Sequence, residues 1–178
     1  LIPSTDYIIN KASANDMRVC LDINYRPAFW DDTANAPARI DALAKQASII
    51  KASREELSAL YGDDNADARV QQWLDSGAKV VLVTDGGEPI HYVTKAFKGT
   101  LVSPKADVKD TTAAGDSFIG GFLYYVSTHV QNTEAFTAWT QHEENISAAT
   151  AFAIRCGAYT VTQYGAFSAL PTQANLAG

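Results

Sequence analysis

The stretch DTTAAGDSFIGGFLYYV, residues 110–126, places small residues between two aspartates and follows them with an apolar run. The apolar run predicts a helix over residues 115–128 that is apolar on nearly all sides, so we expect it to be central in the fold. Gly120 and Gly121 would let this helix approach a neighbouring helix closely. The small side chains of residues 113–115 predict a turn that leads directly into its first turn.

This turn has the features of an anion site. The first turn of a helix leaves backbone N–H groups without intrahelical partners. Together with the helix dipole, the amides of Ala113, Ala114 and Gly115 would form an anion hole without a lysine. Asp116 lies beside them, where an ionised carboxylate can accept a proton from a hydroxyl, and this pair of features suits phosphoryl transfer. The alternative is that Thr112 or Asp116 only caps the helix and the alanines pack against the sheet.

Outward from this stretch, short apolar runs alternate with amphipathic helical stretches. This pattern is typical of an α/β fold in which crossover helices join the strands of a mainly parallel sheet. Strands are predicted over residues 18–23, 47–51, 79–84, 90–94 and 99–104, with 79–84 and 90–94 forming a hairpin and 99–104 at an edge. Helices are predicted over residues 4–15 (N-cap Ser4 or Thr5), 37–46, 53–62, 64–76, 115–128 and 133–157.

Composition narrows the class of protein. The chain has 178 residues, 47% of them hydrophobic, which suffices for the core of one domain or part of one. A net charge of -6 without a basic cluster argues against nucleic-acid or anionic-membrane partners. No membrane span or secretory signal is recognisable, so we expect a cytoplasmic protein. Cys20 and Cys156 are expected to be core thiols, and His91, His129 and His142 lack metal-ligand spacing.

Residues 110–118, DTTAAGDSF, resemble the C-terminal signature of the ribokinase-like, or PfkB, carbohydrate kinases, D-T-[TV]-G-A-G-D-[SAT]-F. Ala113 stands where glycine is commonest. Four further stretches agree with this family, namely LDINYRPAFW (21–30), KASREEL (51–57), VVLVTDGG (80–87) and CGAYTVTQYGAFSALP (156–171). The resemblance implies a three-layer α/β sandwich with a mainly parallel sheet, of which this chain is the C-terminal half.

The resemblance also implies roles for two loops. Asn24 would lie near the nucleotide phosphates and Arg26 near the acceptor or the transferred phosphate, a role that suits a planar, permanently charged group. A loop salt bridge is the alternative. Ser53 and Glu56 fall on the family's N-x-x-E element, which helps to organise Mg²⁺ through water, with Ser53 replacing the asparagine beside the nucleotide. The same two residues match a capping box, S-x-x-E, which explains Glu56 without a metal.

Further nucleotide contacts follow from the resemblance. Thr84 and Gly86 match the T-x-G that follows a strand, and Ile154 and Gly157 would border the adenine. An ordinary hairpin turn and helix packing are the respective alternatives. The monovalent-cation loop of some relatives would map to Asp110, Thr112, Thr160, Gln163 and Gly165, with Gln163 in place of a frequent arginine. The implied cofactors are ATP, Mg²⁺ and, through this loop, K⁺.

The family's N-terminal half, with its G-G-N sugar-binding element and β-sheet lid, has no counterpart in these residues. The resemblance therefore predicts that residues 1–178 form one nucleotide-binding portion, whose partner is the N-terminal half of the same fold. Alone, this portion would expose one edge of its sheet. A homodimer would form through the absent lid.

The leading interpretation is ATP-dependent phosphorylation of a sugar primary hydroxyl by a fructokinase-type enzyme, with Asp116 as the base. 2-Keto-3-deoxygluconate kinase and aminoimidazole riboside kinase remain open within this class. A catalytically silent nucleotide- or sugar-binding regulatory module is the alternative from another class. A nicotinamide-dependent dehydrogenase is disfavoured because no G-x-G-x-x-G joins a strand to a helix, and a P-loop enzyme because its motif is absent.

Overall fold

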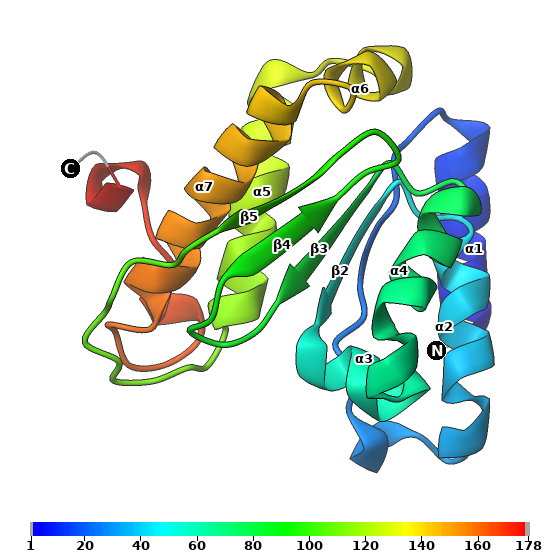
Figure 1. The fold of residues 1–178 in the computed structure, drawn as a ribbon, viewed down its shortest axis with the longest axis horizontal. Coiled ribbons are helices and arrows are strands. Elements are labelled where there is room, and N and C mark those ends of the chain that lie inside the picture. The colour runs from blue at the N-terminus through cyan, green and yellow to red at the C-terminus, as the bar shows by residue number, and fades with distance from the viewer. Residues whose placement is uncertain (1, 177–178) are drawn as a thin grey trace.

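The computed structural model describes residues 2–176, and these residues place one five-stranded sheet between two layers of helices (Figure 1). The strands are β1 (Cys20–Asp22), β2 (Ile49–Ser53), β3 (Val80–Thr84), β4 (Ile90–Val93) and β5 (Lys98–Leu101). The helices are α1 (Ile2–Ala14), α2 (Ala36–Ala44), α3 (Arg54–Tyr61), α4 (Ala66–Asp75), α5 (Ala114–His129), α6 (Thr133–Trp139) and α7 (Glu143–Thr160). Short 3-10 turns complete the connections.

The sheet follows chain order, β1-β2-β3-β4-β5. β1, β2 and β3 pair in parallel, whereas β4 returns antiparallel to β3 and β5 antiparallel to β4. All the described strands except β4 therefore run in one direction. The predicted α/β sandwich, the hairpin after β3 and the edge strand are confirmed.

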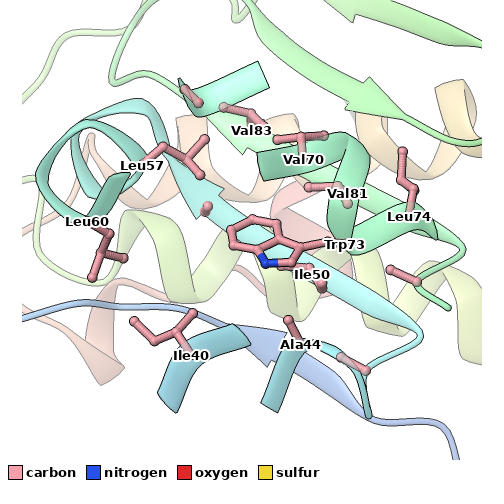
Figure 2. Close-up of a cluster of buried hydrophobic side chains, with 14 of the residues drawn as sticks. Ile40, Ala44, Ile50, Leu57, Leu60, Val70, Trp73, Leu74, Val81 and Val83 are labelled. Atoms are coloured by element: carbon pink, nitrogen blue, oxygen red, sulfur yellow. The ribbon is translucent and has the colours of Figure 1, made fainter. Parts of the chain in front are cut away.

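Each face of the sheet has its own core. Helices α2, α3 and α4 pack on one face around Trp73, Leu57 and Ile50 (Figure 2), and α5 and α7 cover the other face around Phe122 and Phe136. Burial of each such large apolar side chain contributes about 1.5–3 kcal/mol. Because helices cover both faces, the first four residues of β2 and of β3 are all buried rather than alternately buried and exposed.

The close approach predicted for the central helix occurs at one glycine only. A Cβ atom on Gly121 would lie 2.6 Å from the Cys156 sulfur and 3.2 Å from the Cα atom of Ala153, so α7 packs against α5 at this point. A Cβ atom on Gly120 would meet nothing within 4 Å. The expectation for Gly120 is therefore wrong, because this residue faces away from α7.

Two predicted helix boundaries are also wrong. The single helix expected over residues 133–157 is two helices, α6 and α7, with a break at residues 140–142. The Thr140 hydroxyl donates to the carbonyl of Thr137, and the side chain of Asn145 donates to the carbonyl of Trp139, so side chains occupy carbonyls at the end of α6. At the other end of the chain, α1 already begins at Ile2, and neither Ser4 nor Thr5 is its N-cap.

Both cysteines are free, as expected. Burial is the main cause that raises the pKa of Cys20 to about 12, and burial also raises the pKa of Cys156. Both side chains therefore stay protonated thiols at neutral pH. Among the helices described, none combines the length and the apolar character needed to cross a lipid bilayer.

Candidate active site at the carboxyl ends of the strands

Several predicted site residues meet at the carboxyl ends of the parallel strands. Ser53 ends β2 and pairs in register with Thr84, which ends β3. Asp22 ends β1 and pairs in register with Lys51 of β2. A Cβ atom on Gly115, in the first turn of α5, would lie 3.1 Å from Lys51 Nζ, so the start of α5 lies at this same edge. Open α/β sheets bind their ligands at this edge.

The turn before α5 presents backbone donors. Ala113 adopts a left-handed conformation (φ 60°, ψ 11°) and precedes α5 without a side-chain cap. Within the described residues, no group accepts a hydrogen bond from the amides of Ala113, Gly115 or Asp116. The amide of Ala114, by contrast, donates to the carbonyl of Thr111 at 3.2 Å. Of the three amides expected in the anion hole, those of Ala113 and Gly115 are free among the described residues, whereas that of Ala114 is engaged in the turn; the Asp116 amide is free as well.

The carboxylate of Asp116 is exposed beside these donors. In the part of the chain that the structure describes, its side chain makes no hydrogen bond or ion pair, and neither Asp116 nor Thr112 caps α5. Asp116 lies at one end of an open groove of about 280 Å³, which Tyr124, Phe152 and residues 170–173 also line. The carboxylate is therefore free to accept a proton from a bound hydroxyl.

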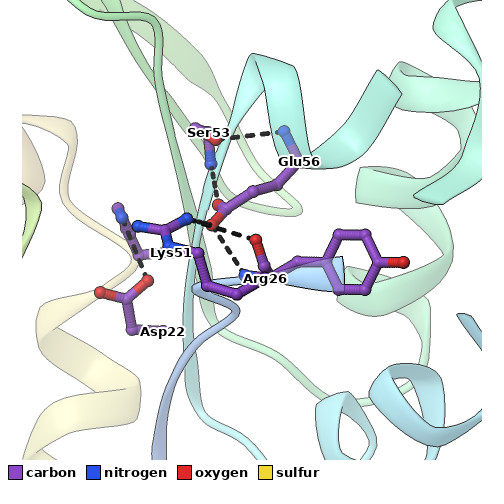
Figure 3. Close-up of polar contacts among 6 residues, drawn as sticks. Asp22, Arg26, Lys51, Ser53 and Glu56 are labelled. Atoms are coloured by element: carbon purple, nitrogen blue, oxygen red, sulfur yellow. Dashed lines mark hydrogen bonds and ion pairs between the residues drawn. The ribbon is translucent and has the colours of Figure 1, made fainter. Parts of the chain in front are cut away.

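Lys51 and Asp22 form a buried ion pair that the sequence analysis missed (Figure 3). Lys51 Nζ lies 3.1 Å from Asp22 Oδ1, and the two side chains are 8% and 20% exposed. Burial raises the pKa of Asp22, the Lys51 ammonium opposes this rise, and the charges of Glu56 and Asp116 add to it. The available signal was a lysine inside the apolar run IIKAS, since buried lysines require partners.

Glu56 joins two segments of the site, as Figure 3 shows. Its Oε2 accepts the amide of Ser53 at 2.7 Å, and the amide of Glu56 donates to Ser53 Oγ, which confirms the predicted capping box. Its Oε1 accepts the amide of Tyr25 at 2.9 Å and lies 3.8 Å from Arg26 Nη1. Glu56 is 6% exposed, and the hydrogen bonds that its carboxylate accepts explain its burial without a metal.

The loop carrying Asn24 and Arg26 is accordingly fixed from α3. Asn24 is exposed and has a positive φ of 40°. The Arg26 side chain is 61% exposed, and its contact with Glu56 is the loop salt bridge that we weighed as the alternative. At this exposure and distance, such a pair contributes little to stability. The guanidinium therefore remains accessible to an anion.

The two residues expected at the adenine have packing roles. Ile154 is 5% exposed and lies in the core that faces the sheet, so its side chain is not open to a nucleotide. A Cβ atom on Gly157 would lie 3.3 Å from the carbonyl oxygen of Ala114, so Gly157 lets α7 approach the start of α5. The packing alternative explains both positions, and the adenine contacts implied by the resemblance stay predictions. Gly86, in the turn after Thr84, has φ +55° and open space around it.

The predicted cation loop is assembled in part. Asp110 Oδ1 accepts the amide of Thr112 at 2.9 Å, and Oδ2 accepts the amide of Gly165 at 2.9 Å. Hydrogen bonds from Thr112 and then from Gly165 lower the pKa of Asp110. The hydroxyl of Thr160 is buried and donates to Ser117 Oγ, while the Gln163 side chain donates to Thr162. Residues 2–176 contain no cluster of three His, Cys, Asp or Glu side chains able to hold a metal ion.

These layers, and a candidate site at the carboxyl ends of parallel strands, define the chain as a three-layer α/β protein with a mainly parallel sheet. The family model described as pfkB family carbohydrate kinase matches residues 8–173, and the chain belongs to this family. The predicted family and fold class are confirmed.

Known proteins of this family resemble the chain over most of its length. It is 39% identical over 154 residues to probable fructokinase-6, chloroplastic, of Arabidopsis thaliana, covering 85% of this chain and 38% of that protein. The structure of fructokinase with bound ATP from Xylella fastidiosa superposes with a TM-score of 0.90 at 32% identity, covering 96% of this chain and 54% of that one. The aminoimidazole riboside kinase of Salmonella enterica gives a TM-score of 0.82 at 29% identity, covering 96% and 55%. The chain thus spans about half the length of the relatives it matches.

Proposed function

We propose that the protein containing these residues is an ATP-dependent sugar kinase of the fructokinase type. The observation that carries this proposal is the carboxylate of Asp116 beside the amides of Ala113, Gly115 and Asp116, all of them without a partner within residues 2–176. The relatives named fructokinase support the choice of sugar. Residues 1–178 would then be the nucleotide-binding portion, and the N-terminal half of the fold its partner.

The residues of this chain would divide the reaction between them. Asp116 accepts the proton of a primary hydroxyl as that oxygen attacks, and the free amides stabilise negative charge on the transferring group. Arg26, largely exposed on the neighbouring loop, adds a permanent positive charge. Bound ATP supplies the phosphoryl group, and Mg²⁺ neutralises charge on its phosphates. No covalent enzyme intermediate is required.

The implied ions differ in how well the residues fit them. Both oxygens of Glu56 already accept amides, so Glu56 fits only a water-mediated role toward Mg²⁺. Both oxygens of Asp110 likewise accept amides, so toward K⁺ the joined loops of Asp110, Thr112 and Gly165 would offer only the remaining lone pairs of this carboxylate. A fructokinase double mutant from Vibrio cholerae is described with fructose, ADP and potassium bound, which supports a potassium role here. The proposal also places Ser53, Thr84 and Gly86 beside the nucleotide.

The proposal leaves two other phosphoryl acceptors open besides fructose. The aminoimidazole riboside kinase of Salmonella enterica is described as a complex with aminoimidazole riboside and an ATP analogue, and its fold matches this chain closely. 2-Keto-3-deoxygluconate is the third acceptor that the sequence left open. We further propose a cytoplasmic location, and a homodimer formed through the lid of the N-terminal half.

The test is a panel of acceptor sugars. The full-length protein that contains these residues is assayed with Mg-ATP and fructose, ribose, 2-keto-3-deoxygluconate or aminoimidazole riboside. Fructose should give the highest kcat/KM. The variant Asp116→Asn should lose about 10²- to 10⁴-fold in kcat and retain ADP binding, because a positioned base contributes about that much. Asp64→Asn, an exposed aspartate in the turn before α4, is the matched control and should keep wild-type turnover.

Two outcomes would contradict the proposal. Undiminished turnover in Asp116→Asn refutes the assigned base. A wild-type protein that binds ADP and a sugar but phosphorylates none of the panel is the silent regulatory module instead.

A further inference from the structure

Lys51 is a buried cation paired with Asp22 at the carboxyl ends of β1 and β2. Its ammonium is 3.1 Å from Asp22 Oδ1, and the charges of Glu56 and Asp116 are both close enough to raise the pKa of Asp22. Arg26, the other cation paired with this group, is 61% exposed, whereas the Lys51 side chain is 8% exposed. Of these two cations at the carboxyl ends of β1 and β2, Lys51 is therefore the buried one.

Lys51 also touches the turn that carries the free amides. A Cβ atom on Gly115 would lie 3.1 Å from Nζ and 3.8 Å from Cε of Lys51, so the end of the lysine lies against this residue. An ammonium has three N–H donors. Among the described residues, Asp22 Oδ1 is the acceptor that engages it. Within the described residues, N–H groups of the Lys51 ammonium therefore remain without an acceptor, and this ammonium lies against the backbone at the start of α5.

Stability alone does not explain this pair. Removing an ammonium and a carboxylate from water costs several kcal/mol per ion, and an apolar pair of similar volume is often equally or more stable. The pair links the ends of β1 and β2 to the start of α5, where the proposed base and anion donors lie. A positive charge at this place raises the electrostatic potential around the free amides of Gly115 and Asp116.

We propose that Lys51 is a positioning residue of the phosphoryl-transfer site. Asp22 holds the Lys51 ammonium against Gly115, in the first turn of α5. There Lys51 supports the backbone of this turn, and its charge strengthens the binding of a nucleotide phosphate at the free amides of Gly115 and Asp116. This inference rests on the proposed function. It assigns Lys51 an effect on nucleotide binding and phosphoryl transfer, and none on the binding of the sugar.

The experiment removes the charge and then its partner. In the full-length protein, Lys51→Met keeps the length of the side chain without its ammonium, and Asp22→Asn with Lys51→Met also removes the carboxylate left unpaired. Binding of ADP without sugar is measured by calorimetry, and stability by urea unfolding. Lys79→Met, at the amino end of β3 and hence remote from the site, is the matched control.

Lys51→Met should weaken ADP binding and lower kcat/KM for ATP by roughly 10- to 100-fold, with the KM for sugar within about 2-fold of wild type. It should also unfold at lower urea, because Asp22 is left buried without a partner. The double variant should recover the urea midpoint and keep the loss of ADP affinity. Lys79→Met should bind ADP as the wild type does.

Recovery of both the urea midpoint and the ADP affinity in the double variant would overturn the inference, since Lys51 would then act only as a structural counter-ion. An unchanged ADP affinity in Lys51→Met would overturn it as well. The ADP measurement needs no turnover, which separates this inference from the proposed function. A wild-type protein that binds ADP but phosphorylates no sugar contradicts the kinase proposal alone, whereas one that does not bind ADP contradicts both.

Discussion

Glu56 Oε1 accepts the backbone N–H of Tyr25 at 2.9 Å, and this one bond fixes the loop after β1 to the start of α3. The other oxygen of the same carboxylate closes the capping box with Ser53. Asn24 and Arg26 flank Tyr25, so the bond also sets where these two exposed polar side chains emerge. A residue expected to serve a metal therefore has a structural function that the sequence showed only in part.

The change Glu56→Ala tests this joint function. It leaves the amides of Tyr25 and Ser53 without their acceptor, while the bond from the amide of residue 56 to Ser53 Oγ remains, so the free energy of unfolding should fall by about 2–4 kcal/mol. Hydrogen exchange of the Tyr25 amide, measured by NMR, should accelerate together with that of Ser53. Glu55→Ala, the exposed neighbour in the same helical turn, is the control and should leave both amides protected. A Tyr25 amide that stays protected in Glu56→Ala would show that another group holds the loop.

Ala113 and Ala114 should respond in opposite directions to replacement by glycine. Ala113 has φ 60°, a left-handed conformation in which a Cβ atom is strained, so Ala113→Gly should raise the free energy of unfolding by about 1 kcal/mol. Ala114 is the first residue of α5, and Ala114→Gly should lower it by roughly 0.5–1 kcal/mol. Urea unfolding of both variants provides the measurement. If both Ala113→Gly and Ala114→Gly lowered the free energy of unfolding, the left-handed conformation of Ala113 would not be strained.

Interactions between residues close in the sequence could be predicted from it, whereas interactions between distant residues could not. The capping box of Ser53 and Glu56 was predicted because its two members are three residues apart, and Gly62 ends α3 as expected. The pairing of Lys51 with Asp22 joins residues 29 apart and depends on the parallel register of β1 and β2. No periodicity within either segment contains that information.

The same reason explains the errors among the helices. The break between α6 and α7 has no glycine or proline, and it depends on the Asn145 side chain reaching the carbonyl of Trp139. Ile154 was expected at the adenine by resemblance, yet which face of α7 it occupies is set by packing against the sheet. Free amides at the start of α5 were expected from the small residues and from the first turn of the helix, but which of them stayed free depended on the turn that Ala114 closes with Thr111.

Gly121→Ala should separate α5 from α7. The added Cβ atom would lie 2.6 Å from Cys156 Sγ, so one element must move, and such overpacking costs about 1–3 kcal/mol. Cys156→Ala in the same chain removes the sulfur and should recover part of the loss, although the Cβ atom of residue 156 remains 3.0 Å away and the Cα atom of Ala153 3.2 Å away. The coupling is measured by a double-mutant cycle in urea. Gly120→Ala is the control and should stabilise the chain by about 0.5–1 kcal/mol, because its Cβ atom meets no neighbour. Strict additivity of Gly121→Ala and Cys156→Ala would contradict the contact.

Asp110 should give the connection before α5 a defined response to acid. Hydrogen bonds from Thr112 and from the Gly165 amide hold the folded pKa of Asp110 below its unfolded value, which is about 3.9. The unfolded chain therefore binds this proton first as the pH falls, so the contribution of Asp110 to stability is complete above about pH 5 and is lost as the pH falls through the folded pKa. The variant Asp110→Asn lacks this charge. Its free energy of unfolding should lie below that of the wild type at pH 7, and the difference should shrink as the pH is lowered stepwise from 5 to 3. A difference that stays constant over this range, or that grows toward acid pH, would show that the carboxylate of Asp110 does not hold the Gly165 loop through its charge.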